Sequence, residues 1–167
     1  MRDVALRSAV ANDENALWLM LFYASHSHDD PEAMPDDVMA DPDLQRYVAR
    51  WGRAGDMGVI AESDGDICGA AWLRLFAEGD RGDVTYVDAR TPELAVAVLP
   101  GLEGSGIGTA MLTKLFDLAR PVHSAIVLSV REGNPAVSLY GRLGFRAVDG
   151  ITNRVGTRSI KMVLDLS

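Results

Sequence analysis

Hydrophobic residues near the start of the chain recur at helical spacing. This spacing predicts a helix over Ala9–Ala24, with Asn12 or Asp13 as its N-cap. Its apolar face carries Leu17, Met20, Leu21 and Ala24. From Ser25 to Pro42, His, Asp and Pro predominate, which predicts a loop with at most short helices. A second helix is expected to follow over Asp43–Arg53.

Shorter apolar runs predict strands in the middle of the chain. The runs 58–62 and 67–73 flank Asp64-Gly65, a dipeptide that favours positive φ, so we expect them to pair as an antiparallel hairpin. A loop rich in Gly and Asp over 78–83 then leads to a short strand around 84–87.

A strand, a helix and a second strand follow in close succession. In 93–98 the larger apolar residues alternate with Glu or Ala, which is typical of a strand, and Pro100 ends it. Apolar residues return at helical spacing over 107–118, before Pro121, and 125–130 is apolar on both faces. This succession predicts a right-handed βαβ unit with two parallel strands.

The last part of the chain carries the signals of one short helix and two strands. Asn134 can cap a helix that has Pro135 at its first position and Gly144 just past its end. Strands are expected to start at Phe145 and to run over Ser159–Leu166, where alternate residues are apolar.

Composition and charge restrict the class of protein. The 167 residues are 48% hydrophobic and 24% charged, which predicts one folded domain over 1–167. The apolar stretch 16–24 is too short to span a bilayer, so neither a signal peptide nor a membrane partner is expected. A net charge of -8 disfavours nucleic acid as a partner and would attract a cationic amine. The single cysteine, Cys68, and the lack of zinc-ligand spacing predict a cytoplasmic protein without a metal.

Three glycines at alternate positions connect the strand over 93–98 to the helix over 107–118. The turn is Glu103-Gly104-Ser105-Gly106-Ile107-Gly108, and its glycines let backbone N–H groups converge on an anion that no side chain blocks. The positive end of the following helix favours a pyrophosphate there. An ordinary tight strand-to-helix turn is the alternative. A P-loop is excluded because Thr109-Ala110 follows in place of Lys and Ser, and Gly-x-Gly-x-Gly lacks the spacing of a dinucleotide-binding turn.

The order of these segments resembles the GCN5-related N-acetyltransferase (GNAT) family. The resemblance is strong over 58–149 and rests on 93–100, 103–108, 128–130, 134–140 and 144–145. It implies an α/β fold with a mixed sheet of six or seven strands, flanked by helices, whose two central parallel strands splay apart. It further implies transfer of an acetyl group from acetyl-CoA to a primary amine by direct attack in a ternary complex. The acceptor amine is not determined, and a homodimer through edge strands or C-terminal segments is compatible with the family.

The resemblance also implies roles for individual residues. The cofactor-binding positions are Val96, Ala97, Val98, Glu103, Gly104, Ser105, Gly106, Ile107, Gly108, Thr109, Asn134 and Tyr140. Tyr140 stands where the family places the catalytic acid that protonates the departing thiolate; the alternative is a tyrosine that packs on its helix and only hydrogen-bonds the sulfur. Glu93 stands where some members supply a base, directly or through water. A solvated carboxylate at the strand end is the alternative for Glu93, and Asp88 or Tyr86 could serve as the base instead.

One position departs from the family pattern. Glu103 stands where Gln or Arg is usual, and its carboxylate would repel a pyrophosphate unless the side chain points to solvent. We expect cofactor binding to survive because backbone N–H groups form most of the site. A non-catalytic acyl-CoA-binding module is the second class of function that the sequence allows.

The remaining candidates have simpler interpretations. Cys68 is expected to be a small packed residue rather than a nucleophile. The three tryptophans are expected in the core or at its rim: Trp18, Trp51 and Trp72. For Trp72, a place in the lining of a pocket is the alternative. His26 and His28 are expected in a mobile polar loop rather than in an acceptor site.

Overall fold

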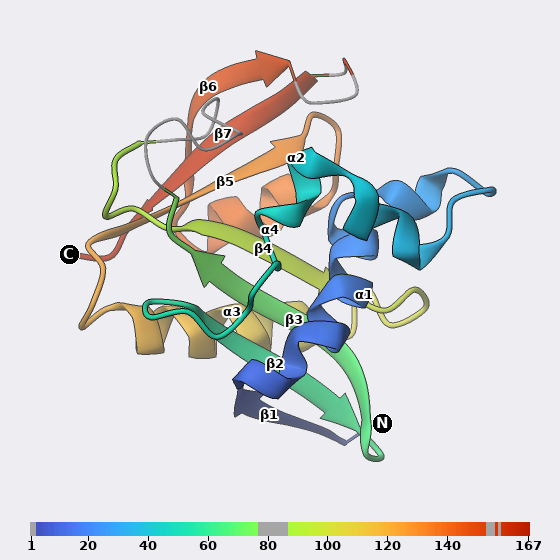
Figure 1. Cartoon of the computed structure of the whole chain (residues 1–167). Helices are drawn as coiled ribbons and strands as arrows, with labels where there is room; N and C mark the ends of the chain where they lie inside the picture. Colours follow the sequence, from blue (N-terminus) through green and yellow to red (C-terminus); the bar gives the residue numbers. More distant parts are fainter. Residues whose placement is uncertain (1–2, 77–86, 153–155, 157) are drawn as a thin grey trace. The chain divides into compact units, whose positions relative to one another are not determined.

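Seven strands in a mixed sheet organise the residues that the computed structural model describes, which are 3–76, 87–152, 156 and 158–167 (Figure 1). The hydrogen-bonded order of the strands is β1-β2-β3-β4-β5-β7-β6, which confirms the predicted mixed α/β fold. The strands are β1 Val4–Ser8, β2 Met57–Ser63, β3 Asp66–Arg74, β4 Glu93–Val98, β5 Ala125–Arg131, β6 Arg146–Thr152 and β7 Arg158–Asp165. The helices are α1 Glu14–Ala24, α2 Pro42–Gln45, α3 Ile107–Ala119 and α4 Ala136–Arg142, with 3-10 turns η1 Ala11–Asp13, η2 Ser27–Asp29 and η3 Pro35–Ala40.

The chain divides into two units, each described by itself. The first unit comprises Met1–Arg74 and Ala95–Leu118, and the second comprises Leu75–Leu94 and Ala119–Ser167. That the whole chain forms one domain stays a prediction. No helix in the described ranges is both long enough and apolar enough to cross a membrane.

An antiparallel meander of β1, β2 and β3 forms the first part of the sheet. β1 runs antiparallel to β2, and β2 runs antiparallel to β3. In the turn between β2 and β3, Asp64 has a φ of 54° and Gly65 a φ of 83°, the positive values that this dipeptide favours. The predicted hairpin is confirmed.

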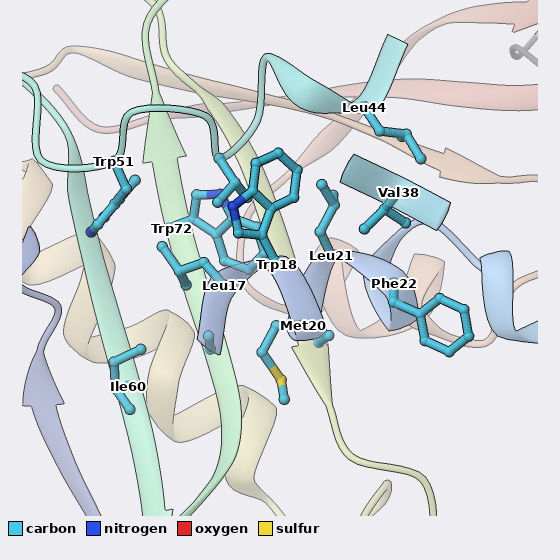
Figure 2. Packing of buried hydrophobic residues seen from close by; sticks show 13 residues of the cluster. Leu17, Trp18, Met20, Leu21, Phe22, Val38, Leu44, Trp51, Ile60 and Trp72 are labelled. Carbon is cyan, nitrogen blue, oxygen red and sulfur yellow. The ribbon is translucent and has the colours of Figure 1, made fainter. Parts of the chain in front are cut away.

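Helix α1 covers one face of this meander with a hydrophobic core (Figure 2). Ile60 of β2 and Ala70 of β3 are register partners, so their side chains share a face, and Trp72 lies on the same face two residues along. These residues pack in one cluster with Leu17 and Leu21 of α1, which are 0% and 2% exposed. Burial of this apolar face stabilises the helix, which is short for a helix in isolation.

All three tryptophans belong to this core, as the sequence predicts. Trp18, Trp51 and Trp72 are 8%, 6% and 1% exposed. The indole N–H of Trp72 donates to the Tyr47 carbonyl at 2.9 Å, which satisfies its one polar atom. Trp72 is therefore a core residue.

The opposite face of β3 contacts α3 at a glycine. Gly69 precedes Ala70 and so faces away from α1. A Cβ atom at Gly69 would lie 3.0 Å from Met111 Cε and 3.1 Å from the Ala97 carbonyl oxygen. Glycine therefore lets Met111 of α3 and the backbone of β4 approach β3 more closely than a side chain would allow.

The first helix starts later than predicted. α1 begins at Glu14 rather than Ala9, because β1 and a 3-10 turn occupy the residues before it. The Arg7 guanidinium of β1 lies 2.8 Å from an Asp13 carboxylate oxygen and 2.7 Å from a Glu62 oxygen of β2. Asp13 takes the N-cap position, but its carboxylate bonds to Arg7 and not to the helix. The ion pairs thus tie β1 both to its neighbouring strand and to the start of α1.

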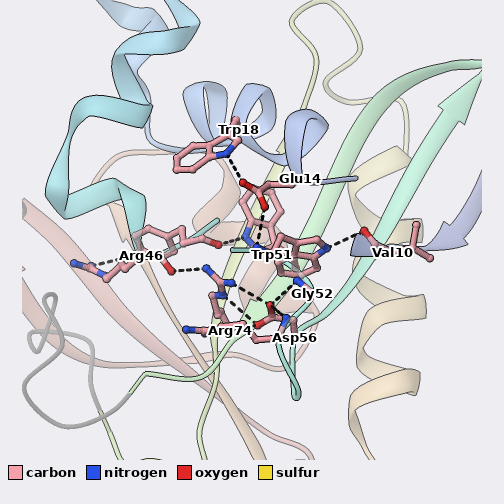
Figure 3. A network of polar contacts seen from close by, with 11 residues as sticks. Val10, Glu14, Trp18, Arg46, Trp51, Gly52, Asp56 and Arg74 are labelled. Atoms are coloured by element: carbon pink, nitrogen blue, oxygen red, sulfur yellow. Dashed lines mark hydrogen bonds and ion pairs between the residues drawn. The ribbon is translucent and has the colours of Figure 1, made fainter. Parts of the chain in front are cut away.

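The second helix is four residues long, Pro42–Gln45, where the sequence predicts Asp43–Arg53. Backbone hydrogen bonds continue as turns to Ala49, whose N–H donates to the Gln45 carbonyl at 2.8 Å, and Arg50 then has a positive φ of 59°. Tertiary contacts also hold this segment (Figure 3). Arg74 of β3 and Asp56 are 1% and 3% exposed in their side chains and form a two-pronged ion pair, with both N···O distances 3.1 Å. Arg74 also donates to the Arg46 carbonyl at 3.0 Å. These bonds attach the segment 46–56 to β3.

Glu14 of α1 holds the same segment from its other side (Figure 3). One carboxylate oxygen accepts the Trp51 backbone N–H at 3.1 Å, and the other accepts the Trp18 indole N–H at 3.2 Å. The Trp51 indole donates to the Val10 carbonyl at 3.1 Å. The 46–56 segment is therefore fixed between α1 and the sheet without forming a continuous helix.

The second unit is built on β5, β7 and β6. β7 pairs antiparallel with both β5 and β6, and Glu93 of β4 lies opposite Val127 of β5 in parallel register. The predicted parallel relation of β4 and β5 is confirmed, and their divergence beyond this pair stays a prediction. Gly144 follows α4 with a φ of 105°, as expected of a glycine past a helix end. The predicted loop 78–83 and strand 84–87 lie outside the described residues, apart from Val87.

Candidate functional site

The glycine-rich turn joins the end of β4 at Val98 to the start of α3 at Ile107. Gly101, Gly104 and Gly106 have φ values of 89°, 76° and 89°, a region that residues with a side chain rarely adopt. A Cβ atom at Gly104 or Gly106 would meet nothing within 4 Å, so the backbone there faces open space. An approaching ligand can therefore contact the backbone of the turn directly.

Backbone N–H groups are available along the second half of this turn. The first hydrogen bond into α3 runs from the Ala110 N–H to the Gly106 carbonyl at 3.0 Å, so the preceding N–H groups at the helix start have no helical acceptor. Among the described residues, the N–H groups of Gly104, Gly106, Ile107, Gly108 and Thr109 form no hydrogen bond. Together with the positive end of α3, they are available to an anion, and the anion site itself stays a prediction.

Internal hydrogen bonds fix the first half of the turn. The Leu102 N–H donates to the Leu99 carbonyl at 3.1 Å, and the Ser105 hydroxyl donates to the Leu102 carbonyl at 2.5 Å. The exposed Glu103 accepts the Gly101 N–H on its carboxylate at 2.8 Å. The Glu103 side chain thus bends back toward the β4 end of the turn.

The central residues of β4 differ in solvent exposure. Val96 and Val98 are half-buried, whereas Ala97 is 8% exposed. Just past β4, the Leu99 N–H donates to the Cys68 carbonyl at 2.9 Å, which joins this end of the strand to β3. Cys68 itself is 3% exposed, which fits a packed residue.

Tyr140 lies on α4 in the second unit. Its side chain is 8% exposed and meets the Phe145 ring edge to face, with ring centres 5.7 Å apart. Burial raises the pKa of Tyr140 to about 12, because the charged phenolate loses its hydration there. The hydroxyl forms no hydrogen bond with the residues that the structure describes. It therefore keeps its proton and has it available for donation.

Asn134 caps α4. Its carboxamide oxygen accepts the Ala136 N–H at 2.9 Å, and its backbone carbonyl accepts the Val137 N–H at 3.0 Å. The capping part of the predicted role is confirmed. Contact of Asn134 with a cofactor stays a prediction.

The candidate bases differ in environment. Glu93 is 5% exposed and lies opposite Val127, so it is not the solvated carboxylate of the alternative interpretation. Asp88 is exposed and accepts the Arg90 N–H at 2.8 Å and the Thr91 hydroxyl at 2.9 Å. These hydrogen bonds lower the pKa of Asp88 below its ordinary value, which makes Asp88 a weak base. Tyr86 lies outside the described residues.

His26 and His28 follow α1 and lie against each other. Their rings stack with centres 5.9 Å apart, and the Asp29 carboxylate is 3.6 Å from His26 Nδ1 and 3.7 Å from His28 Nε2. The His28 ring also meets the Tyr23 ring edge to face at 5.1 Å. The loop is thus packed on the end of α1, and its mobility stays a prediction.

The sequence did not predict two features that the structure shows, the positive φ of Gly101 and the ion pair of Arg74 with Asp56. Gly101 lies outside the predicted motif, although a glycine directly after Pro100 is a local signal of a turn. The Arg74–Asp56 pair has no such signal, because its partners are far apart in the sequence and in different local patterns. The structure alone brings them together.

Comparisons with known proteins agree on one family. A family model described as the acetyltransferase (GNAT) family matches residues 16–145. The chain is 30% identical over 144 residues to a mycothiol acetyltransferase of Streptomyces avermitilis, covering 85% of this chain and 42% of the relative. It is 42% identical over 55 residues to the [ribosomal protein bS18]-alanine N-acetyltransferase of Haemophilus influenzae, covering 32% of this chain and 38% of the relative. The chain thus spans less than half the length of these curated relatives.

A solved structure supports the same fold. It is yncA of Salmonella typhimurium with its cofactor acetyl-CoA, which superposes with a TM-score of 0.69 at 22% identity and covers 99% of this chain and 95% of its own. At this level of identity the likeness concerns the fold.

Proposed function

Because the chain belongs to the acetyltransferase (GNAT) family, we propose that it is an N-acetyltransferase that moves an acetyl group from acetyl-CoA to a primary amine. The observation that carries this proposal is the row of backbone N–H groups from Gly104 to Thr109 that lack an acceptor at the start of α3. A pyrophosphate is the part of acetyl-CoA that such a row suits.

The residues of the turn fit that group. Its N–H groups supply hydrogen bonds, Gly104 and Gly106 leave the approach open, and the helix end contributes a partial positive charge. We propose that the backbone of Val96, Ala97 and Val98 binds the pantetheine arm. Acetyl-CoA supplies the thioester as the acetyl donor. An N–H group of this strand then stabilises the oxyanion that develops when the amine attacks.

We propose that Tyr140 protonates the departing thiolate. Burial keeps the phenol in its protonated form, which a proton donor requires before the thiolate forms. The hydroxyl has no described acceptor of its own that would compete for the proton.

We propose Glu93 as the group that accepts a proton from the substrate ammonium, directly or through water, so that the neutral amine can attack. Glu93 is buried, whereas Asp88 is exposed and already accepts two hydrogen bonds, and this difference supports Glu93. The low pKa of Asp88 makes that residue the weaker candidate.

The acceptor is proposed to be a cationic amine. Residues 8–45 contain nine Asp and Glu but no Lys or Arg, so the negative field of the protein is concentrated in that segment. The relatives named above are a mycothiol acetyltransferase and a [ribosomal protein bS18]-alanine N-acetyltransferase, which suggests a small-molecule amine and an Ala-initiated peptide as test amines. Spermidine is a suitable third amine because of its high charge.

The test begins with thermal unfolding in the presence of acetyl-CoA, CoA and NAD. A rise in melting temperature with acetyl-CoA and CoA but not with NAD supports the proposal. Release of free thiol on adding one of the amines then establishes transfer. Binding of CoA without thiol release from any amine would favour the alternative, a non-catalytic acyl-CoA-binding module, and no binding would contradict both.

We further propose a cytoplasmic protein that works on its amine without nucleic acid or metal, and that associates as a homodimer. The acidic composition and the single buried Cys68 support the first statement. The molar mass in solution, measured by light scattering, tests the homodimer: 18.0 kDa corresponds to a monomer, and twice that mass to a dimer.

A further inference from the structure

The glycine-rich turn and the strand before it supply no cation of their own. Between Arg90 and Lys114 the sequence has no Lys or Arg, and the one charged residue in the turn is Glu103. What the turn itself offers a pyrophosphate is its N–H groups, so these groups have to be held in place before the ligand arrives. A turn with three glycines at positive φ has many alternative conformations and loses much entropy when it is ordered.

Glu103 supplies one of the bonds that hold it. Its carboxylate accepts the Gly101 N–H at 2.8 Å, next to the bonds from Leu102 N–H to the Leu99 carbonyl and from Ser105 to the Leu102 carbonyl. The hydrogen bond from Gly101 to the Glu103 carboxylate has a charged acceptor, so it is of a stronger type than the other two, whose acceptors are neutral carbonyls. The three bonds involve the first half of the turn and leave the N–H groups of the second half to a ligand.

From this geometry we infer that Glu103 is a positioning residue for the acyl-CoA phosphates, an inference that rests on the proposed function. Its side chain has two opposite effects. The hydrogen bond to Gly101 orders the turn and favours binding, whereas the negative charge repels the phosphates and weakens it. Glu103→Gln separates the two effects, because glutamine keeps an oxygen acceptor of the same reach and loses the charge. Glu103→Ala removes both.

The experiment measures the affinity of the wild-type protein and the two variants for CoA and for pantetheine, which lacks the phosphates, by calorimetry. Glu103→Gln is expected to bind CoA roughly two- to fivefold more tightly than the wild type, the range for one exposed charge. Glu103→Ala is expected to bind CoA roughly three- to tenfold more weakly than Glu103→Gln, because the anchoring hydrogen bond is lost. Pantetheine affinity should not respond to the change from Glu to Gln.

Asp64→Asn is the matched control, since it removes one negative charge from an exposed hairpin turn whose positive φ asparagine accepts. It should leave CoA affinity unchanged. A second readout needs no ligand: the amide proton of Gly101, followed by NMR, should move upfield in Glu103→Ala and stay near its wild-type position in Glu103→Gln.

Equal CoA affinity of the Ala and Gln variants would overturn the inference, and so would a Gly101 resonance that does not move in Glu103→Ala. Equal tightening by Asp64→Asn and Glu103→Gln would show a general effect of net charge and would also overturn it. A wild-type protein that binds no CoA overturns the proposed function, and the Gly101 resonance then still decides whether Glu103 anchors the turn.

Discussion

At the scale of single residues, burial decides what Tyr140 can do. A phenol in water has a pKa of 10.0, and burial raises that of Tyr140 to about 12. The proton is therefore retained at neutral pH, and in the proposed role it passes to the thiolate as the carbon–sulfur bond breaks.

Tyr140→Phe is expected to lower kcat by roughly a hundredfold while the KM for acetyl-CoA changes little, because the proton donor is lost and the ring packing on Phe145 is kept. Steady-state thiol-release kinetics measure both constants. Tyr47→Phe, which removes a hydroxyl that accepts a bond from Arg46, serves as the control and should leave kcat unaltered. An equal kcat for Tyr140→Phe and the wild type would remove Tyr140 from the mechanism.

At the scale of elements, two close contacts determine how helices and loops lie on β3. Gly69 lets Met111 of α3 reach the sheet, and Arg74 fastens the 46–56 segment through Asp56. Neither contact depends on helix or strand propensity. At both places a single residue sets the position of a whole element.

Gly69→Ala is expected to destabilise the fold by about 1–3 kcal/mol, since its Cβ would lie 3.0 Å from Met111 Cε and must push α3 or its side chain aside. Gly141→Ala in α4 has open space and should stabilise by up to about 1 kcal/mol through its helix propensity. Urea unfolding gives both free energies. A Gly69→Ala variant that is more stable to urea than Gly141→Ala would contradict the packing described for Gly69.

Asp56→Asn is expected to destabilise by about 3–5 kcal/mol, because it leaves the Arg74 charge buried without its carboxylate. The exposed pair of Arg158 and Glu132, with side chains 67% and 59% exposed, is the comparison: Glu132→Gln should change stability by less than about 0.5 kcal/mol. Equal effects of the two substitutions, measured by thermal or urea unfolding, would show that burial of Arg74 is unimportant.

At the scale of the whole molecule, ionisable groups in different places set the pH range of stability. The ion pair with Arg7 lowers the pKa of buried Asp13 below its ordinary value of 3.8. The stability that Asp13 contributes is therefore present above that value and is lost as the pH falls through the lower folded-state pKa. For Tyr140 the folded-state pKa is raised, so its contribution is present below pH 10.0 and is lost as the pH rises toward about 12.

Stability measured by urea unfolding is therefore expected to fall at both ends of the pH scale, below about pH 4 and above about pH 10. Asp13→Asn should make the loss of stability at acid pH smaller and leave the loss at alkaline pH unchanged. Tyr140→Phe should reduce the loss at alkaline pH and leave the loss at acid pH unchanged. A variant that alters the loss at the wrong end of the pH scale, or at neither end, would contradict the assignment of that loss to its residue.

Short-range patterns in the sequence determined much of this molecule. Asp64-Gly65 specified the hairpin, the apolar stripe after Ile107 specified α3, and Asn134 specified the start of α4, because each signal depends on neighbours a few residues away. The glycine-rich turn was predicted for the same reason: positive φ at Gly104 and Gly106 is a local requirement.

Only the tertiary structure decided the rest. β1 forms because its backbone pairs with β2, and Arg7 adds a bond to Glu62. The predicted second helix ends early, and Arg74 and Glu14 hold the segment after it by other bonds. The direction of the Glu103 carboxylate and the burial of Tyr140 likewise depend on the arrangement of the folded backbone. Pairings between distant residues leave no periodic trace, since their energy comes from burial and geometry that the folded chain creates.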